Sequence, residues 1–282
     1  MSGKIKVHVL HTGEVCISPG LPYYDEKVKS PIQLSLLMPY GRRNRIWIAV
    51  SCYLIEHPKG MILFDTGWSR EMSPNGVYDK KAQKKHLGLF RYYLNQGKVP
   101  MGETAVEQLT EMGIKPEDID YVILSHMHAD HASALRSFKN AKKVLLSEEE
   151  NEDITKYSYR YATGQWEGVK LETFHLENTG IGPAGKSLDL FGDGTIELIN
   201  IPGHTNGLCA MRISSGDKFV LLFADGGYAE KSWKEMIRPG TALDGDMAMK
   251  SLKWIHDTAL DENCIEALAN HDPDVKPHVI EV

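Results

Sequence analysis

Apolar and polar positions alternate along several short stretches of the chain, which is the pattern of β-strands that bury one face. The alternation is clear in Lys4–Leu10. Trp47–Glu56 is rich in β-branched and aromatic residues, the turn sequence HPKG follows it, and Met61–Asp65 is apolar again. Two such runs joined by a short turn predict a β-hairpin. The later runs TIELINI, CAMRI and KFVLLFAD predict further strands, with SSGD joining the last two.

Helical spacing interrupts these strand-like runs in both halves of the chain. In TAVEQLTEMG, Val106 and Leu109 lie three residues apart, Thr104 is the expected N-cap and Gly113 the expected stop. A second apolar stripe predicts a late helix that packs on the core, and it comprises Met249, Leu252, Ile255 and Ala259. Strands with interspersed helices predict an α/β protein.

A long connection, residues 69–103, mixes turn residues, four lysines and the apolar run LGLFRYYL. A connection of this length inside a compact fold is usually a lid or a binding loop. We therefore predict one domain over residues 1–282, in which residues 69–103 form a lid or a pocket wall.

Composition and charge exclude several classes of partner. The net charge of −6 argues against a broad nucleic-acid surface. No apolar run reaches the roughly 18 residues that span a bilayer, and the N-terminus lacks the apolar segment of a secretory signal. The four cysteines show no CxxC spacing, which predicts reduced, mostly buried thiols in a cytoplasmic protein. Oligomeric state has no signature in the sequence.

Side chains that carry chemistry recur where predicted strands end. They are Asp65, His126, His204, Asp225 and His271. Strand ends are rigid, and a rigid scaffold suits a preorganised site. We expect the seven histidines outside the cluster described next and outside these positions to be ordinary surface or core residues.

The stretch ILSHMHADHAS places His126, His128, Asp130 and His131 within six residues, directly after a strand. A sharp turn there would direct the first two toward one point and the last two toward a neighbouring point. Burying so many titratable groups without a metal would be costly. With three further strand-end ligands, the set exceeds what one zinc ion binds. It predicts two divalent ions bridged by a carboxylate and a water.

Five blocks in order, ILFDTG, SHMHADH, PGHTNG, FAD and ANHD, resemble the metallo-β-lactamase superfamily. The resemblance implies an αββα sandwich, with two mixed β-sheets face to face and helices outside. It implies that His126, His128 and His204 hold one metal, that Asp130, His131 and His271 hold the other, and that Asp225 bridges them. His128 stands where the oxygen-reducing branch usually has a glutamate, which favours Zn²⁺, although such ligands also accept Mn, Co or Fe.

Tyr228 follows Asp225 by three residues, and a phenol there is suited to stabilising an oxyanion. This spacing of an aspartate and a tyrosine resembles that of the N-acyl homoserine lactonases. It implies that a metal-bridging hydroxide opens the ring ester of a small acyl lactone, supported by Tyr228, and that Asp130 hands a proton to the leaving alkoxide. LGLFRYYL and the Pro31–Trp47 region are candidates for the acyl groove. ASALRSF replaces the usual glycine-rich continuation, and bulk at Ser133–Leu135 is expected to reshape the entrance.

Two other functions remain open on these residues. One is a related dizinc hydrolase of another ester, a thioester or a phosphodiester. The other is a mononuclear iron oxygenase. GIGPAGKS (Gly180–Ser187) matches a phosphate-binding loop expression, but the sequence after it is too short for the required helix, so we predict a surface loop.

Overall fold

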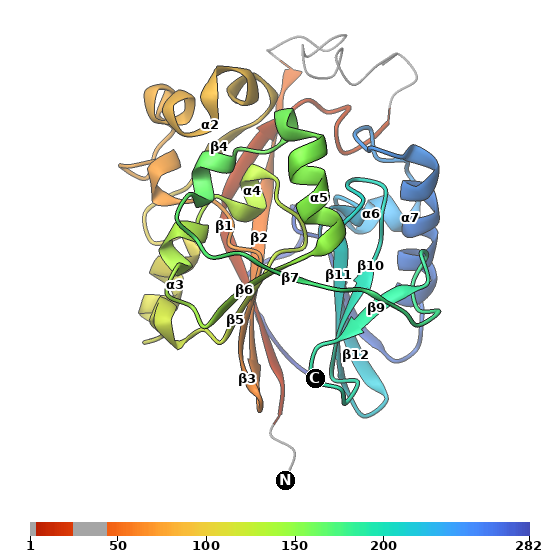
Figure 1. The fold of residues 1–282 in the computed structure, drawn as a ribbon. Coiled ribbons are helices and arrows are strands. Elements are labelled where there is room, and N and C mark those ends of the chain that lie inside the picture. The colour runs from red at the N-terminus through yellow and green to blue at the C-terminus, as the bar shows by residue number, and fades with distance from the viewer. Residues whose placement is uncertain (1–3, 25–43) are drawn as a thin grey trace.

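The computed structural model describes residues 4–24 and 44–282, which form two mixed β-sheets that pack face to face with helices on both outer sides (Figure 1). This is the αββα arrangement that the sequence predicts. In the described part of the chain, no helix is both long and apolar enough to cross a membrane.

The first sheet has the strand order β14-β1-β2-β3-β5-β6-β7, and β4 pairs with β1. Its strands are β1 (Lys6–Ile17), β2 (Ile46–His57), β3 (Gly60–Phe64), β4 (Gln96–Lys98), β5 (Tyr121–Ile123), β6 (Lys143–Ser147), β7 (Glu172–Phe174) and β14 (Val279–Glu281). The predicted hairpin is β2–β3, which pairs antiparallel. From β3 to β7 the strands run parallel, so their carboxyl ends meet at one edge of the sheet.

The second sheet has the order β13-β12-β11-β10-β9-β8. Its strands are β8 (Glu177–Asn178), β9 (Lys186–Asp189), β10 (Ile196–Asn200), β11 (Cys209–Ser215), β12 (Lys218–Leu222) and β13 (Cys264–Leu268). The predicted second hairpin is β11–β12, and β13 adds in parallel to β12. Lys186 and Ser187 of the phosphate-loop match lie in β9 rather than in the predicted surface loop, and β10 follows instead of the helix that a phosphate-binding loop requires.

Helices cover both outer faces (Figure 1). They are α2 (Lys80–Leu94), α3 (Ala105–Glu111), α4 (Ala129–Ala132), α5 (Glu148–Lys156), α6 (Glu230–Lys234) and α7 (Gly245–Ala259). Short 3₁₀ turns connect them: η2 (Arg70–Met72), η3 (Pro116–Asp118), η4 (Leu135–Phe138), η5 (Ser158–Arg160), η6 (Thr163–Trp166) and η7 (Ala224–Gly226). Thr104 caps α3 as predicted, because its hydroxyl accepts from the Glu107 amide while the Glu107 carboxylate accepts from the Thr104 amide.

Strand alternation divides the core into layers. Val7 and Val9 of β1 face the second sheet and pack with Leu198 of β10, whereas Leu10 faces the helices outside the first sheet. On the far side, α7 packs on the second sheet through its predicted apolar stripe, of which Leu252 and Ile255 are fully buried. Burial of every second residue thus fixes the register of the strands in both sheets. The polar groups lie at the ends of the strands.

Residues 69–103 are more ordered than a simple loop. Asp79 caps α2 by accepting from the amides of Lys81 and Ala82. Gly88 interrupts the helix with φ of 77°, and β4 follows and joins the first sheet. The segment therefore begins beside the sheet and returns to it, which places the end of α2 near the strand ends.

Candidate metal centre

Strand ends deliver the candidate ligands. After β5, the chain runs through His126 and His128 and then turns into α4, which carries Asp130 and His131. His204 follows β10, Asp225 lies in η7 after β12, and His271 follows β13. Both sheets therefore contribute to one site.

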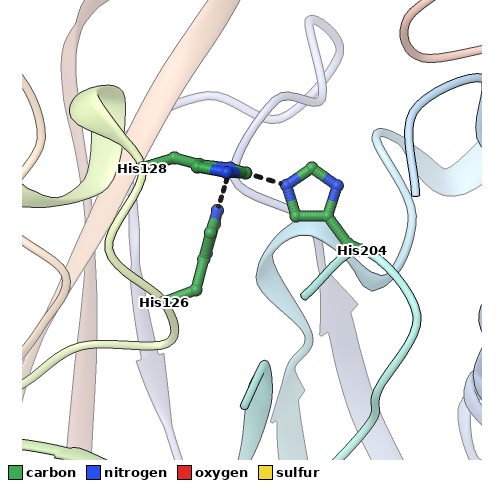
Figure 2. A group of neighbouring side chains, drawn as sticks. All are labelled: His126, His128 and His204. Atoms are coloured by element: carbon green, nitrogen blue, oxygen red, sulfur yellow. Dashed lines mark hydrogen bonds between the residues drawn. The ribbon is translucent and has the colours of Figure 1, made fainter. Parts of the chain in front are cut away.

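Three imidazoles converge first. Nδ1 of His128 lies 3.0 Å from Nε2 of His126 and 2.8 Å from Nε2 of His204 (Figure 2). All three side chains are buried or nearly so. Three nitrogens that face one another in this way match the three protein ligands of an open tetrahedral metal site.

A second group comprises Asp130, His131 and His271, whose ligand atoms all lie within 4.8 Å of one another. Nε2 of His271 is 3.6 Å from Oδ2 of Asp130. One carboxylate and two imidazoles are again a suitable donor set for a divalent ion.

Asp225 lies between the two groups and turns one oxygen toward each. Its Oδ1 is 3.1 Å from Nε2 of both His131 and His271. Its Oδ2 is 3.4 Å from Nε2 of His204 and 3.9 Å from Nε2 of His126. The structure thus brings together all seven residues that the sequence singles out as metal ligands.

The outward nitrogens of four of these histidines are held by acceptors. The acceptors are the Ser125 hydroxyl for His126, the Asp65 carboxylate for His131, the Thr241 carbonyl for His204 and the Ala49 carbonyl for His271. An N–H on the outer nitrogen leaves the inner nitrogen with its lone pair directed into the site, as in known metal centres. His128 is the exception, because its outward Nε2 accepts from Arg160 at 3.2 Å, which places the proton of the neutral ring on the inward Nδ1. A metal ion at Nδ1 would displace that proton and this hydrogen bond.

Two buried atoms at the centre have no hydrogen-bond partner, namely Nε2 of His131 and Oδ1 of Asp225. When His131 is neutral and its proton lies on Nδ1 toward Asp65, both atoms are acceptors, and two buried acceptors 3.1 Å apart repel each other. A cation between them removes this repulsion. The residues present therefore fit a bound metal.

The electrostatics agree with this fit. Burial lowers the pKa of His126 and His128 well below the usual value and that of His204 to about 4, so these rings stay neutral and able to coordinate. Burial alone would also lower the pKa of His131, but the carboxylates of Asp225 and Asp65 outweigh it and raise that pKa well above its usual value. Asp225 thus favours positive charge beside it.

Tyr228 lies beside the ligands, as its sequence position suggests. Its ring stacks on His271, with the centroids 5.4 Å apart and the planes inclined by 19°. Burial and the Asp225 carboxylate raise the pKa of the phenol well above its usual value. The hydroxyl therefore remains a hydrogen-bond donor.

A cavity of about 330 Å³ opens onto Asp130, Asp225, Tyr228 and the three histidines His128, His204 and His271. The rest of its described lining is largely apolar and includes Val15, Ile17, Leu21, Phe90, Leu94 and Leu243. The end of α2 therefore forms part of the wall, and closure of residues 69–103 as a lid stays a prediction. Residues 31–43 of the proposed acyl groove lie outside the described residues.

The expected effect of bulk at Ser133–Leu135 is wrong. Leu135 is fully buried in the core between the first sheet and its helices, and Ser133 bonds Ser69 and His86 beneath the surface. None of the three residues lines the cavity.

Several site residues have no signal in the sequence. Arg160 lines the cavity and donates to His128 Nε2 and to the His204 carbonyl. Glu150 and Asp153 of α5 hold the two ligand loops, since Glu150 accepts from the Met127 amide and Asp153 from the Asn206 amide. In the sequence, the acidic start of α5 indicates only a favourable charge near a helix N-terminus. The contacts of Glu150 and Asp153 with the ligand loops depend on how the two sheets pack, which the sequence does not show.

The family model of the metallo-β-lactamase superfamily matches residues 45–256. The chain belongs to the metallo-β-lactamase superfamily. It is therefore a hydrolase of this superfamily, with histidine and aspartate groups suited to divalent metals.

Curated relatives include the "Probable metallo-hydrolase" of Mycobacterium tuberculosis, which is 28% identical over 251 residues, or 83% of this chain and 76% of the relative. The N-acyl homoserine lactonase AttM of Azorhizobium caulinodans is 27% identical over 254 residues, or 86% of this chain and 89% of AttM. Among solved structures, B. thuringiensis AiiA with N-decanoyl-L-homoserine bound at its active site has a TM-score of 0.73 at 20% identity, covering 96% of this chain and 94% of AiiA. The structural likeness supports the αββα fold.

Proposed function

We propose that this protein hydrolyses the ring ester of N-acyl homoserine lactones with the help of two divalent ions, most readily Zn²⁺. The observation that carries the proposal is the position of Asp225, whose two oxygens face two separate sets of histidines. The sequence similarity to the AttM lactonases supports the choice of substrate.

In this proposal His126, His128 and His204 hold the first ion, and Asp130, His131 and His271 hold the second, with Asp225 shared. Two such ions lower the pKa of a water between them and polarise an ester carbonyl. Imidazole and carboxylate ligands suit zinc, and manganese, cobalt and iron are the alternatives.

Tyr228 is proposed to donate a hydrogen bond to the carbonyl oxygen as it gains negative charge. The stacking of its ring on His271 fixes the direction of the phenol. A preorganised donor of this kind stabilises the transition state more than the ground state.

Asp130 is proposed to transfer the proton that the leaving ring oxygen needs. Both carboxyls line the cavity, but the Asp130 side chain is 11% exposed, whereas the Asp225 side chain is 4% exposed and faces four imidazoles. The more exposed acid, Asp130, is the better placed of the two for proton transfer. We further propose a cytoplasmic location, which the four unpaired cysteines support.

The test is turnover of N-hexanoyl and N-decanoyl homoserine lactone by protein whose metal content has been measured. We expect proton release and an open-ring product at two ions per chain, and loss of both after chelation. Protein that binds two ions but hydrolyses neither lactone would contradict the proposal. Hydrolysis of thioesters or phosphodiesters by that same protein would assign it to the related dizinc hydrolases. A content of one iron per chain without zinc would assign it to the mononuclear iron oxygenases.

The Asp225→Asn variant provides the matched comparison, because it keeps the size of the shared ligand and removes its charge. We expect this variant to bind at most one ion tightly and to lose activity. Asp193→Asn is the control, since Asp193 is an exposed partner of Lys59 in the loop before β10, whereas the candidate ligand His204 follows the other end of that strand.

A further inference from the structure

Two arginines line the cavity without a carboxylate partner. Arg91 comes from the last turn of α2 and Arg160 from the end of η5, and both belong to the cavity wall. Within residues 4–24 and 44–282, neither guanidinium lies within ion-pairing distance of an acidic side chain. The two acids of the described lining, Asp130 and Asp225, face the candidate metal centre instead.

Each guanidinium keeps unused donors. Arg91 donates from Nη2 to the Ser158 carbonyl, and its Nε is buried with no partner among the described residues. Arg160 donates from Nε to His128 and from Nη2 to the His204 carbonyl, and its Nη1 has no partner in the described chain. Because Ser158 opens the turn that Arg160 ends, the bond from Arg91 ties both arginines to one part of the wall.

A guanidinium that is partly removed from water and lacks a counter-charge favours an incoming anion. Burial lowers the pKa of Arg91, which is the expected result of desolvation without a partner. Guanidinium groups match carboxylates particularly well, because their planar fork donates two parallel hydrogen bonds. The apolar remainder of the lining suits a short aliphatic chain.

We infer that Arg91 and Arg160 bind a carboxylate carried by the acyl group, so that the preferred substrates are acyl lactones or esters whose acyl group is acidic. This inference rests on the proposed function and narrows its substrate class. A neutral acyl chain would add no anionic partner to these two guanidinium groups, which have none among the described residues, so it would bind less tightly than an acidic chain.

The test compares two lactones of equal chain length, N-hexanoyl and N-adipoyl homoserine lactone, on zinc-loaded protein. We expect kcat/KM for the adipoyl compound to be higher by about tenfold, mainly through KM, and the advantage to shrink with added salt. Equal values, or a preference for the hexanoyl compound, would overturn the inference.

Arg91→Met and Arg160→Met are expected to bring that ratio down to about one. Arg160 touches a candidate ligand, so the zinc content of each variant is measured. If Arg160→Met loses zinc, the result for Arg91→Met alone decides the test. Retention of the preference in Arg91→Met with its zinc intact would overturn the inference. Arg136→Met is the matched control, because Arg136 is paired with Glu167 and does not line the cavity.

A binding measurement tests the preference for an acidic acyl group separately from lactone turnover. The open-ring products N-adipoyl-homoserine and N-hexanoyl-homoserine are titrated against the same protein by calorimetry. Tighter binding of the acidic product, lost in Arg91→Met, supports the inference even if neither lactone is hydrolysed, and in that case only the proposed function fails. Equal binding of the two products would overturn the inference while leaving lactone hydrolysis unaffected.

Discussion

Asp65 accepts a hydrogen bond from Nδ1 of His131 at 2.8 Å, and both side chains are completely buried. The same carboxylate accepts from the amide and hydroxyl of Ser125 and from Nδ2 of Asn270, each at 2.8 Å. Ser125 precedes His126, and Asn270 precedes His271. One carboxylate outside the candidate ligand set therefore positions three of the candidate ligands, which lie on two loops.

Asp65→Asn is expected to weaken binding of the second ion by about 10- to 100-fold, because the amide no longer holds the proton on Nδ1 of His131. Asparagine tolerates the positive φ of 61° at this position, so the backbone is not strained. Competition with a chromophoric chelator measures both affinities, with Asp193→Asn as the control. Unchanged affinity for the second ion would show that Asp65 does not set the protonation of His131.

Tyr228→Phe is expected to lower kcat by about 100-fold while both ions stay bound, because the ring still stacks on His271 but the oxyanion donor is gone. The measurement is lactone turnover together with metal content. Tyr161→Phe is the matched control, since the ring of Tyr161 lies 5.5 Å from that of His128 but does not line the cavity. Activity loss that tracks metal loss in Tyr228→Phe would contradict the role proposed for this residue.

Glu150 is expected to make stability fall as pH rises. Burial raises the pKa of its carboxyl to about 7, so the folded chain retains a proton that the unfolded chain releases between about pH 4.5 and 7. Stability from this group is complete below that window and is lost above it, on the order of 3 kcal/mol in all.

Glu150→Gln removes the titration and keeps a carbonyl for the Met127 amide. Urea unfolding in chelator at pH 5 and pH 8 should therefore show the variant gaining stability relative to the parent at pH 8. Glu152→Gln, an exposed position on the same helix, is the control. An equal pH dependence in parent and Glu150→Gln would rule out a raised pKa for Glu150.

Local chemistry determined much of the fold from the sequence alone. Thr104 and Glu107 predict the start of α3 because capping depends on residues three apart. The hairpins follow from alternation and short turns for the same reason. By contrast, α2 was missed, since Gly88 breaks its helical pattern and its only clear signal is Asp79 as the N-cap.

The spacing of His126, His128, Asp130 and His131 after a strand also determined, without coordinates, that a candidate metal site lies at that strand end. Only the tertiary structure decided how Asp225 divides its oxygens between two groups, which acceptors orient the histidines, and that Arg91 and Arg160 share the cavity wall. These relationships join residues far apart in the chain. They depend on the packing and register of two sheets, and a linear pattern carries no information about which distant side chains that packing brings into contact.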